Sequence, residues 1–194
     1  MFTLTAPFSL EEEAKKSRFI AKANHVETPE QAHAFLKEIY LADASHHCWA
    51  YRIGNLYRFS DDGEPSGSAG QPILAAIEGQ NIDQVMVIVI RYFGGTKLGV
   101  GGLVRAYSSA TANCLRQADK QKILHFVPIE FEAPFSFTGD LFNILSQFHI
   151  IDKAENYTSA GIFFSAKILE EQADEFVVRI KDASKGKVEI KKIL

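Results

Sequence analysis

Cysteine is scarce in this sequence of 194 residues, where only Cys48 and Cys114 occur. Two isolated cysteines provide neither a disulfide framework nor a zinc-binding pattern, and they suit buried thiols in a reducing cytosol. No apolar run approaches the roughly 18 residues of a membrane-spanning helix, and the first 20 residues lack the hydrophobic stretch of a signal peptide. These absences predict a cytoplasmic protein that makes no contact with a membrane. No pattern in the sequence indicates a cofactor.

The sequence also lacks low-complexity tracts and a strong net charge. Hydrophobic residues make up 46% of it and the net charge is −3, which predicts a globular chain with one large or two small domains. A weakly acidic protein does not coat nucleic acid through bulk charge. Residues 91–122, however, carry six Lys or Arg and a single acid, Asp119. This local basic stretch is compatible with selective contact to phosphate.

The most informative segment is Val85–Tyr107, which we interpret as a strand, a glycine-rich loop and the start of a helix. Six apolar residues, Val85–Ile90, predict a strand that is covered on both faces. Arg91, Lys97 and Arg105 place one cation on the strand, the loop and the helix. Free N–H groups at a helix start beside Lys and Arg favour an anion, with phosphate as the first candidate. The glycines are Gly94, Gly95, Gly99, Gly101 and Gly102.

This loop matches neither of two familiar phosphate-binding loops. The Walker loop needs Gly-Lys-Ser/Thr, but Leu98 and Gly99 follow Lys97 here. The dinucleotide-binding pattern is approached by Gly99-Val-Gly-Gly, but its third glycine is displaced and no acidic residue lies near Gln121. The number of glycines and the interleaved cations still favour a functional loop over a purely structural connection.

The residue pattern divides the chain into two modules, residues 1–128 and 129–194. The first contains a strand, an amphipathic helix, a hairpin, a second helix, the Val85–Ile90 strand and a helix after the glycine loop. The strand is expected at Lys16–Ala23 and the amphipathic helix at Pro29–Leu41. The hairpin is expected at His46–Ile53 with Leu56–Phe59, and the second helix at Ala69–Glu78. In the second module we expect strands at 129–137, 150–157, 160–168 and 187–193, with helices at 139–148 and 170–183. That β-α-β-β-α-β order is the ferredoxin-like split motif.

Two polar clusters are candidates for chemistry, His46-His47-Cys48 and Asp61-Asp-Gly-Glu-Pro65. Adjacent histidines on a strand point to opposite faces, so they cannot both bind one metal without a bulge. The acidic cluster matches no calcium or zinc pattern and is typical of a turn, which we favour over a metal site. We predict no metal site. We also expect both clusters to lie beside the Gly94–Gly102 loop in one polar cleft, because α/β sites gather at strand and helix ends.

Taken together, these motifs resemble the IMPACT family, and in particular its bacterial YigZ branch. The residues that carry the resemblance are Lys16-Ser-Arg-Phe-Ile20, His46-His-Cys48, Asp61-Asp-Gly-Glu-Pro65, Gly67-Ser-Ala-Gly70, Arg91-Tyr-Phe-Gly-Gly95 and Leu98-Gly99. The resemblance implies an α+β protein in which an N-terminal domain of the ribosomal-protein-S5 domain 2-like fold precedes a ferredoxin-like domain. The latter would be similar to the last domain of elongation factor G. Both folds recur in ribosome-associated proteins, which implies contact with RNA or the ribosome by analogy.

Our leading hypothesis is therefore a non-catalytic factor that regulates translation by binding RNA or the ribosome through the basic, glycine-rich loop. Tyr92, Phe93 or Tyr107 would stack on an unpaired base. The residues expected to contact phosphate or nucleic acid are Arg18, Arg91, Tyr92, Gly94, Gly95, Lys97, Gly101, Gly102, Arg105 and Arg116.

Two other hypotheses remain open. One is a nucleotide-dependent or hydrolytic enzyme whose acid or base comes from His47, Asp61, Asp62 or Glu64. The other is a protein-binding module that docks a partner through the exposed face of the C-terminal sheet.

Overall fold

The computed structural model describes residues 1–192, which form two compact units, Met1–Ile123 and the segment from Leu124 onward. Within the described residues the chain has five α-helices and three sheets, which confirms the expected α+β class. None of those helices combines the length and the apolar character that crossing a membrane requires.

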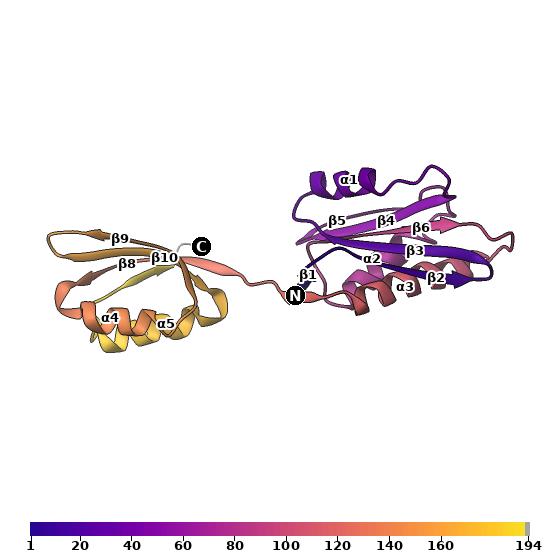
Figure 1. Ribbon diagram of the computed structural model, residues 1–194. Coiled ribbons are helices and arrows are strands. Elements are labelled where there is room, and N and C mark those ends of the chain that lie inside the picture. Colours follow the sequence, from indigo (N-terminus) through magenta and orange to yellow (C-terminus); the bar gives the residue numbers. More distant parts are fainter. Residues whose placement is uncertain (193–194) are drawn as a thin grey trace. The chain divides into compact units, whose positions relative to one another are not determined.

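The first unit is built on a five-stranded antiparallel sheet in the order β2-β3-β6-β4-β5. Helix α1 lies on one face of this sheet, and α2 and α3 lie on the other (Figure 1). The strands are β2 (Phe8–Ala14), β3 (Ser17–His25), β4 (His46–Ile53), β5 (Leu56–Ser60) and β6 (Val85–Tyr92). The helices are α1 (Pro29–Glu38), α2 (Gly70–Gly79) and α3 (Val100–Gln117). A separate pair joins β1 (Phe2–Leu4) to β7 (Lys120–Lys122).

The central strand β6 has helices on both faces, as its apolar sequence predicts. Because side chains alternate along a strand, β6 contributes to two hydrophobic clusters. Val85, Val87 and Val89 belong to the cluster under α2 and α3, and Met86, Ile88 and Ile90 belong to the cluster under α1. The strand continues through Arg91 to Tyr92, two residues beyond the apolar run. Arg91 therefore projects toward the side of α2 and α3.

Three short elements at the ends of the first unit are absent from the sequence-based expectation. They are β1, β2 and β7. Helix α3 ends at Gln117, and strand β7 begins three residues later at Lys120. The Lys120 ammonium donates hydrogen bonds to the carbonyl oxygens of Leu115 at 2.6 Å and Ala118 at 2.9 Å, so it caps the end of α3.

The second unit has a four-stranded antiparallel sheet in the order β11-β8-β10-β9, and α4 and α5 lie against one of its faces (Figure 1). Its elements are β8 (Phe126–Pro134), η1 (Phe135–Phe137), α4 (Thr138–Leu145), β9 (Ile150–Tyr157), β10 (Gly161–Leu169), α5 (Glu170–Ala183) and β11 (Ile190–Lys192). The expected β-α-β-β-α-β order is confirmed. Strand β8 begins three residues before the expected start at residue 129. Of the strand expected at 187–193, residue 193 lies outside the described residues.

Candidate functional site

A pocket of about 290 Å³ lies in the first unit where β6 ends. Its walls come from the acidic loop, the end of β6, the glycine loop and the first turn of α3. The lining residues are Glu64, Pro65, Arg91, Phe93, Lys97, Leu98, Gly99, Val100 and Leu103. The expected meeting of the acidic loop with the glycine loop is confirmed, but the walls are mainly apolar. The charged groups are Glu64, Arg91 and Lys97.

The glycine loop follows its path because Gly94 has no side chain. A Cβ atom on Gly94 would lie 1.8 Å from the carbonyl oxygen of Lys16, a distance that no side chain could adopt. Gly95 and Gly99 have φ angles of +83° and +74°, which favour glycine. The close approach at Gly94 brings the turn between β2 and β3 against the loop that follows β6.

A buried ion pair lies at this pocket. The Arg91 guanidinium donates from Nη1 to Glu64 Oε1 at 2.5 Å, and the exposed fractions of the two side chains are 6% and 4%. The Tyr107 hydroxyl of α3 donates to the same oxygen at 2.7 Å. Glu64 thus joins the acidic loop to β6 and α3. Arg91 also lies over the rings of Phe19 and Phe93. Arg91 is 5% exposed, so most of its side chain is enclosed by the protein, although it lines the pocket.

Cys48 and Tyr107 are uncharged members of this buried network of hydrogen bonds. The Cys48 sulfur lies 3.0 Å from the Asp61 carbonyl oxygen and 3.3 Å from the Tyr107 hydroxyl. Burial raises the pKa of the Cys48 thiol to about 12, and burial also raises the pKa of Tyr107 far above its usual range. Both groups keep their protons at neutral pH, so Cys48 has no thiolate to act as a nucleophile.

Asp61 and Asp62 hold backbone in place. The Asp61 carboxylate accepts hydrogen bonds from the N–H groups of Gly67, Ala69 and Gly70 at 2.8–3.0 Å, which caps the start of α2 from the beginning of the loop that joins β5 to this helix. The half-exposed Asp62 carboxylate accepts the His47 N–H at 2.6 Å. Both candidate carboxylates therefore fix the acidic loop to its neighbours.

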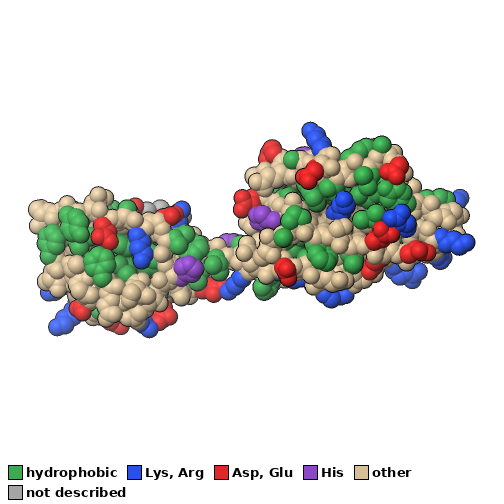
Figure 2. Space-filling view, viewed as in Figure 1, with side chains coloured by type: hydrophobic (Ala, Val, Ile, Leu, Met, Phe, Trp, Pro, Cys, Tyr) green, Lys and Arg blue, Asp and Glu red, His purple; other side chains and the backbone are tan. Residues whose placement is uncertain are grey.

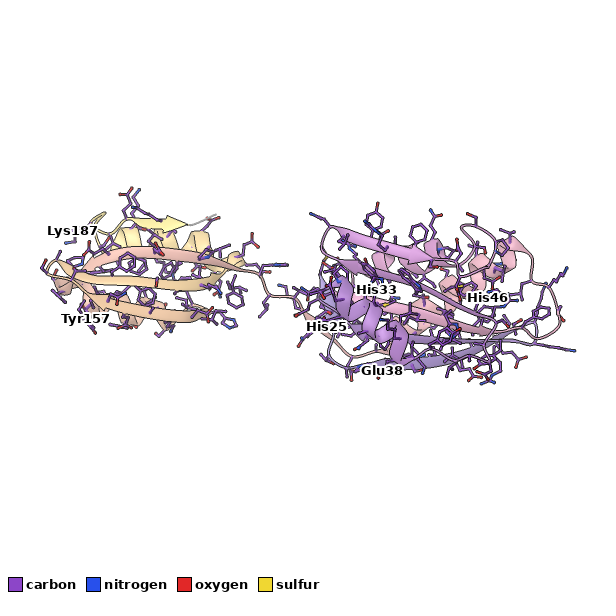
Figure 3. All side chains as sticks on the ribbon, turned by 90° about the horizontal axis from the view of Figure 1, so that it is seen from above. His25, His33, Glu38, His46, Tyr157 and Lys187 are labelled. Carbon is purple, nitrogen blue, oxygen red and sulfur yellow. The ribbon has the colours of Figure 1, made fainter. Side chains whose placement is uncertain are left out.

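The adjacent histidines point to opposite faces of the sheet, as alternation predicts. His47 is buried, its Nε2 accepts the Leu41 N–H at 3.1 Å, and its ring stacks on Tyr40. His46 faces the acidic loop, with Nδ1 2.7 Å from the Asp62 carbonyl oxygen and Nε2 3.9 Å from Glu64 Oε1. Figure 3 shows His46 at the opposite end of the first unit from His25. Across residues 1–192, no group of three or more His, Cys, Asp or Glu could hold a metal ion.

The expected phosphate-binding residues occupy several environments. Lys97 and Arg105 are exposed on the glycine loop and α3, while Gly101 and Gly102 lie in the first turn of that helix. Arg18 is exposed but donates two hydrogen bonds to Glu11 at 2.7 and 3.0 Å. The Glu11 hydrogen bond raises the pKa of Arg18, and Arg18 lowers the pKa of Glu11 in return. Arg116 lies in the last turn of α3, far along the helix from the pocket.

Tyr92 and the turn before β3 complete this end of the unit. The Tyr92 hydroxyl donates to Asp43 at 3.2 Å, and the Arg18 guanidinium lies 5.3 Å from the centre of its ring. Lys15 and Lys16 form the exposed β2–β3 turn, with positive φ angles, and sequence reasoning did not include them among the candidates. The sequence signal that could have indicated these two candidates is the pair of adjacent lysines just before Ser17. Figure 2 shows Lys and Arg side chains at the end of the first unit toward which β6 points.

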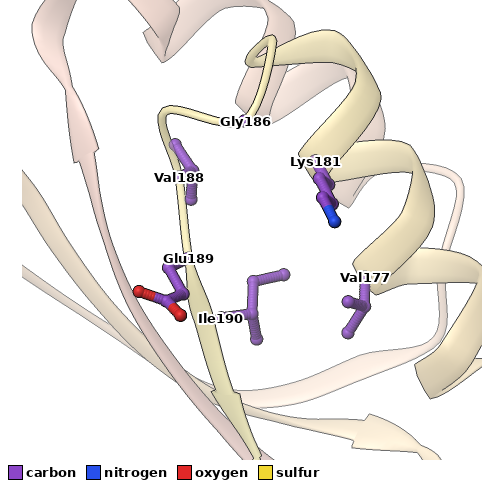
Figure 4. A pocket seen from close by; sticks show the side chains of 6 residues that line it. All are labelled: Val177, Lys181, Gly186, Val188, Glu189 and Ile190. Carbon is purple, nitrogen blue, oxygen red and sulfur yellow. The ribbon is translucent and has the colours of Figure 1, made fainter.

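A recess of about 420 Å³ in the second unit carries none of the candidate residues. It lies between α5 and the segment that leads into β11 (Figure 4). Its lining residues are Val177, Lys181, Gly186, Val188, Glu189 and Ile190. One lysine and one glutamate among aliphatic residues do not form a chemically distinctive site. The pocket at the end of β6 is therefore the candidate site.

Comparison with known proteins connects the site to one family. Residues 15–115 match the model of the Impact N-terminal domain, a range that contains every residue lining the pocket. The chain is 46% identical over 154 residues to the "IMPACT family member in pol 5'region" of Thermus thermophilus, covering 79% of this chain and 85% of that protein. It is 43% identical over 124 residues to the "IMPACT family member YigZ" of Escherichia coli, covering 60% of this chain and 61% of that one.

A solved structure matches the whole chain. It is described as "Crystal structure of an hypothetical protein", and it shares 32% sequence identity with this chain at a TM-score of 0.66. The match covers 100% of this chain and 97% of the other. Both units therefore have counterparts in one experimentally determined protein.

Proposed function

We propose that this chain, which belongs to the IMPACT family, is a translation-associated factor that binds RNA or the ribosome. The binding surface is the end of the first unit formed by the β2–β3 turn, the glycine loop and the start of α3. The observation that carries the proposal is a group of exposed cations at this end. Lys15, Lys16, Lys97 and Arg105 form no ion pair with a carboxylate of residues 1–192.

These cations suit a phosphate backbone for a physical reason. Each phosphate that a Lys or Arg neutralises releases condensed counterions, which favours binding even on a chain with a net charge of −3. The first N–H groups of α3 point out of the same end, because Leu103 is the first residue of this helix whose N–H bonds back, to Gly99. Free N–H groups at a helix start add a favourable contact for an anion.

The architecture supports the same proposal. We assign the first unit to the S5 domain 2-like fold and the second unit, whose strand β8 starts at Phe126, to the ferredoxin-like fold. The β-α-β-β-α-β order of the second unit supports the latter assignment. Both folds occur in ribosome-associated proteins, and a partner of this kind implies a cytoplasmic protein.

The contacts of three of the four catalytic candidates, Asp61, His47 and Glu64, favour binding over catalysis. Asp61 is engaged by three backbone N–H groups, and His47 is buried with its Nε2 accepting a backbone N–H. Glu64 is paired with Arg91. A general acid or base needs a proton that it can exchange with a substrate. Asp61 and His47 are committed to backbone N–H groups, and Glu64 is held as the partner of Arg91 through Oε1.

Fluorescence anisotropy with labelled ribosomal RNA fragments tests the proposal. We expect affinity to fall steeply between low and physiological salt. The double variant Lys97→Ala/Arg105→Ala should weaken binding to all fragments similarly, because phosphate contacts carry no sequence information. It should also lower the magnitude of the slope of log affinity against log salt concentration by about two, because two phosphate contacts are lost.

The matched control is Lys37→Ala/Arg58→Ala, which removes the same charge from exposed positions on α1 and β5. This variant should bind RNA as the wild type does. Equal losses in both double variants would show that net charge, and not this surface, controls binding. Absence of RNA binding by the wild-type protein at low salt would refute the proposal.

A further inference from the structure

The pocket beside the basic surface presents one unused hydrogen-bond acceptor. Arg91 and Tyr107 both donate to Oε1 of Glu64, and His46 faces the same oxygen. Within the described residues Oε2 of Glu64 accepts no hydrogen bond. Among the described residues, the fully enclosed side-chain polar atoms that lack a partner are Arg91 Nε and Thr111 Oγ1. Oε2 is not one of them and so keeps some exposure, and Glu64 lines the pocket.

We propose that this pocket binds an unpaired guanine base of the RNA, with Glu64 as the residue that recognises it. This inference rests on the proposed function, since it names the nucleotide that the same end of the molecule selects. Binding RNA through an extruded base is the usual way in which proteins read RNA sequence.

The walls fit a flat, partly apolar ligand of small size. Phe93 is half-exposed at the pocket and offers a ring face, while Leu98, Val100 and Leu103 supply aliphatic contacts. A volume of about 290 Å³ lies at the lower limit of ordinary ligand sites, which suits one base. Lys97 lines the same pocket, so it can meet the phosphate attached to that base.

The free acceptor favours guanine among the four bases. Guanine presents two neighbouring N–H donors, at N1 and N2, and both can converge on the one free carboxylate oxygen, Oε2. The amino groups of adenine and cytosine lie beside ring-nitrogen acceptors, and the N3–H of uracil lies between two carbonyl oxygens. Those neighbouring acceptors repel a carboxylate oxygen. A carboxylate held in place by Arg91 and Tyr107 therefore discriminates by electrostatic match.

The test compares two labelled heptamers, heptauridylate and the same RNA with guanine at its central position. We expect the full chain to bind the guanine-containing RNA about tenfold more tightly. Glu64→Gln replaces the free acceptor by an amide and should abolish this preference. Phe93→Ala should remove most of it by removing the stacking surface. Tyr57→Ala, which truncates an aromatic residue of similar exposure on β5, should leave it unchanged.

The outcomes separate this inference from the proposed function. Salt-sensitive binding of both heptamers with equal affinity overturns the guanine pocket and leaves the basic surface supported. Absence of binding to either heptamer overturns both. Binding of guanosine monophosphate is measured as well. If the protein binds this nucleotide but binds the two heptamers with equal affinity, the pocket binds a free nucleotide and the RNA assignment is overturned. If circular dichroism shows that Glu64→Gln is unfolded, the preference of Phe93→Ala decides.

Discussion

The substitution Glu64→Leu should destabilise the first unit strongly, because it leaves the Arg91 guanidinium buried without a counterion. Arg91 is 5% exposed, and its other polar contact is with Ser17 Oγ at 3.4 Å. Breaking a buried ion pair by removing one partner costs about 3–5 kcal/mol of unfolding free energy. The Tyr107 hydroxyl, which is fully buried, also loses its acceptor.

The double variant Glu64→Leu/Arg91→Met separates charge from packing. Replacing both members of a buried pair by apolar residues of similar volume is often neutral or stabilising. We therefore expect the double variant to recover most of the stability that Glu64→Leu loses. The difference between the double variant and the sum of the single variants is the coupling energy of the pair.

Urea unfolding followed by Trp49 fluorescence measures these free energies for the first unit alone. Trp49 is the single tryptophan of the chain and lies in β4. With a urea dependence of about 2 kcal/mol per molar, a loss of about 4 kcal/mol lowers the midpoint by about 2 M. A cost below about 1 kcal/mol for Glu64→Leu, or a double variant no more stable than it, would refute the reasoning.

Further predictions concern residues that are buried or closely packed in the first unit. Asp61→Ala should cost about 2 kcal/mol by the same urea assay, because it leaves the N–H groups of Gly67, Ala69 and Gly70 without their acceptor. Gly94→Ala should destabilise the first unit by its clash with Lys16, whereas Gly101→Ala, where a Cβ meets nothing within 4 Å, should not; equal effects would contradict the packing argument. Cys48 and Cys114 have pKa values raised to about 12 by burial, so folding stability should fall as pH rises from about 9, the pKa of an exposed thiol, toward 12. In native protein at pH 8 both thiols should resist iodoacetamide and react only in urea, as mass spectrometry would show.

Much of the fold is encoded locally and was predictable for that reason. The apolar run of β6, the Pro72 that lies in the first turn of α2, and the turn signals of the second unit all act over a few residues. Strand β2 escaped prediction because Glu11, Glu12 and Glu13 interrupt its apolar alternation. It is an edge strand of its sheet, where charged residues are tolerated. Glu12 lies on the side of α3 and binds Asn113, 101 residues away, a contact that no local pattern reveals.

The start of β8 shows a second limit. Pro128 suggested a boundary, yet it lies within the strand, opposite Lys167 of β10. Among residues 1–192, β11 pairs with β8 at Ile129, Glu130 and Phe131, so no described residue lies opposite Pro128 on that side. A residue without an N–H group is tolerated at such a place. The pairing partners that make Pro128 acceptable come from distant segments of the chain.

The role of Glu64 was hidden for a similar reason, although one signal was available. The acidic cluster has the composition of an exposed turn, and nothing in it announces a buried carboxylate. Arg91, however, continues the alternation of Val87 and Val89, so extending the strand by one residue would have placed a cation on the core side. A buried arginine requires a buried acid, and Glu64 is 27 residues away in sequence.

The buried pair explains why the pocket lies at the end of β6. Replacing a buried ion pair by apolar residues is often neutral or stabilising, so stability alone does not account for an ion pair there. Hydrogen bonds differ from apolar contacts because they fix direction. Through Oε1, Glu64 receives hydrogen bonds from β6 and α3 at the same atom, and its own loop is held to α2 by Asp61. Four segments are thereby set in one arrangement around Glu64, which lines the pocket together with Lys97.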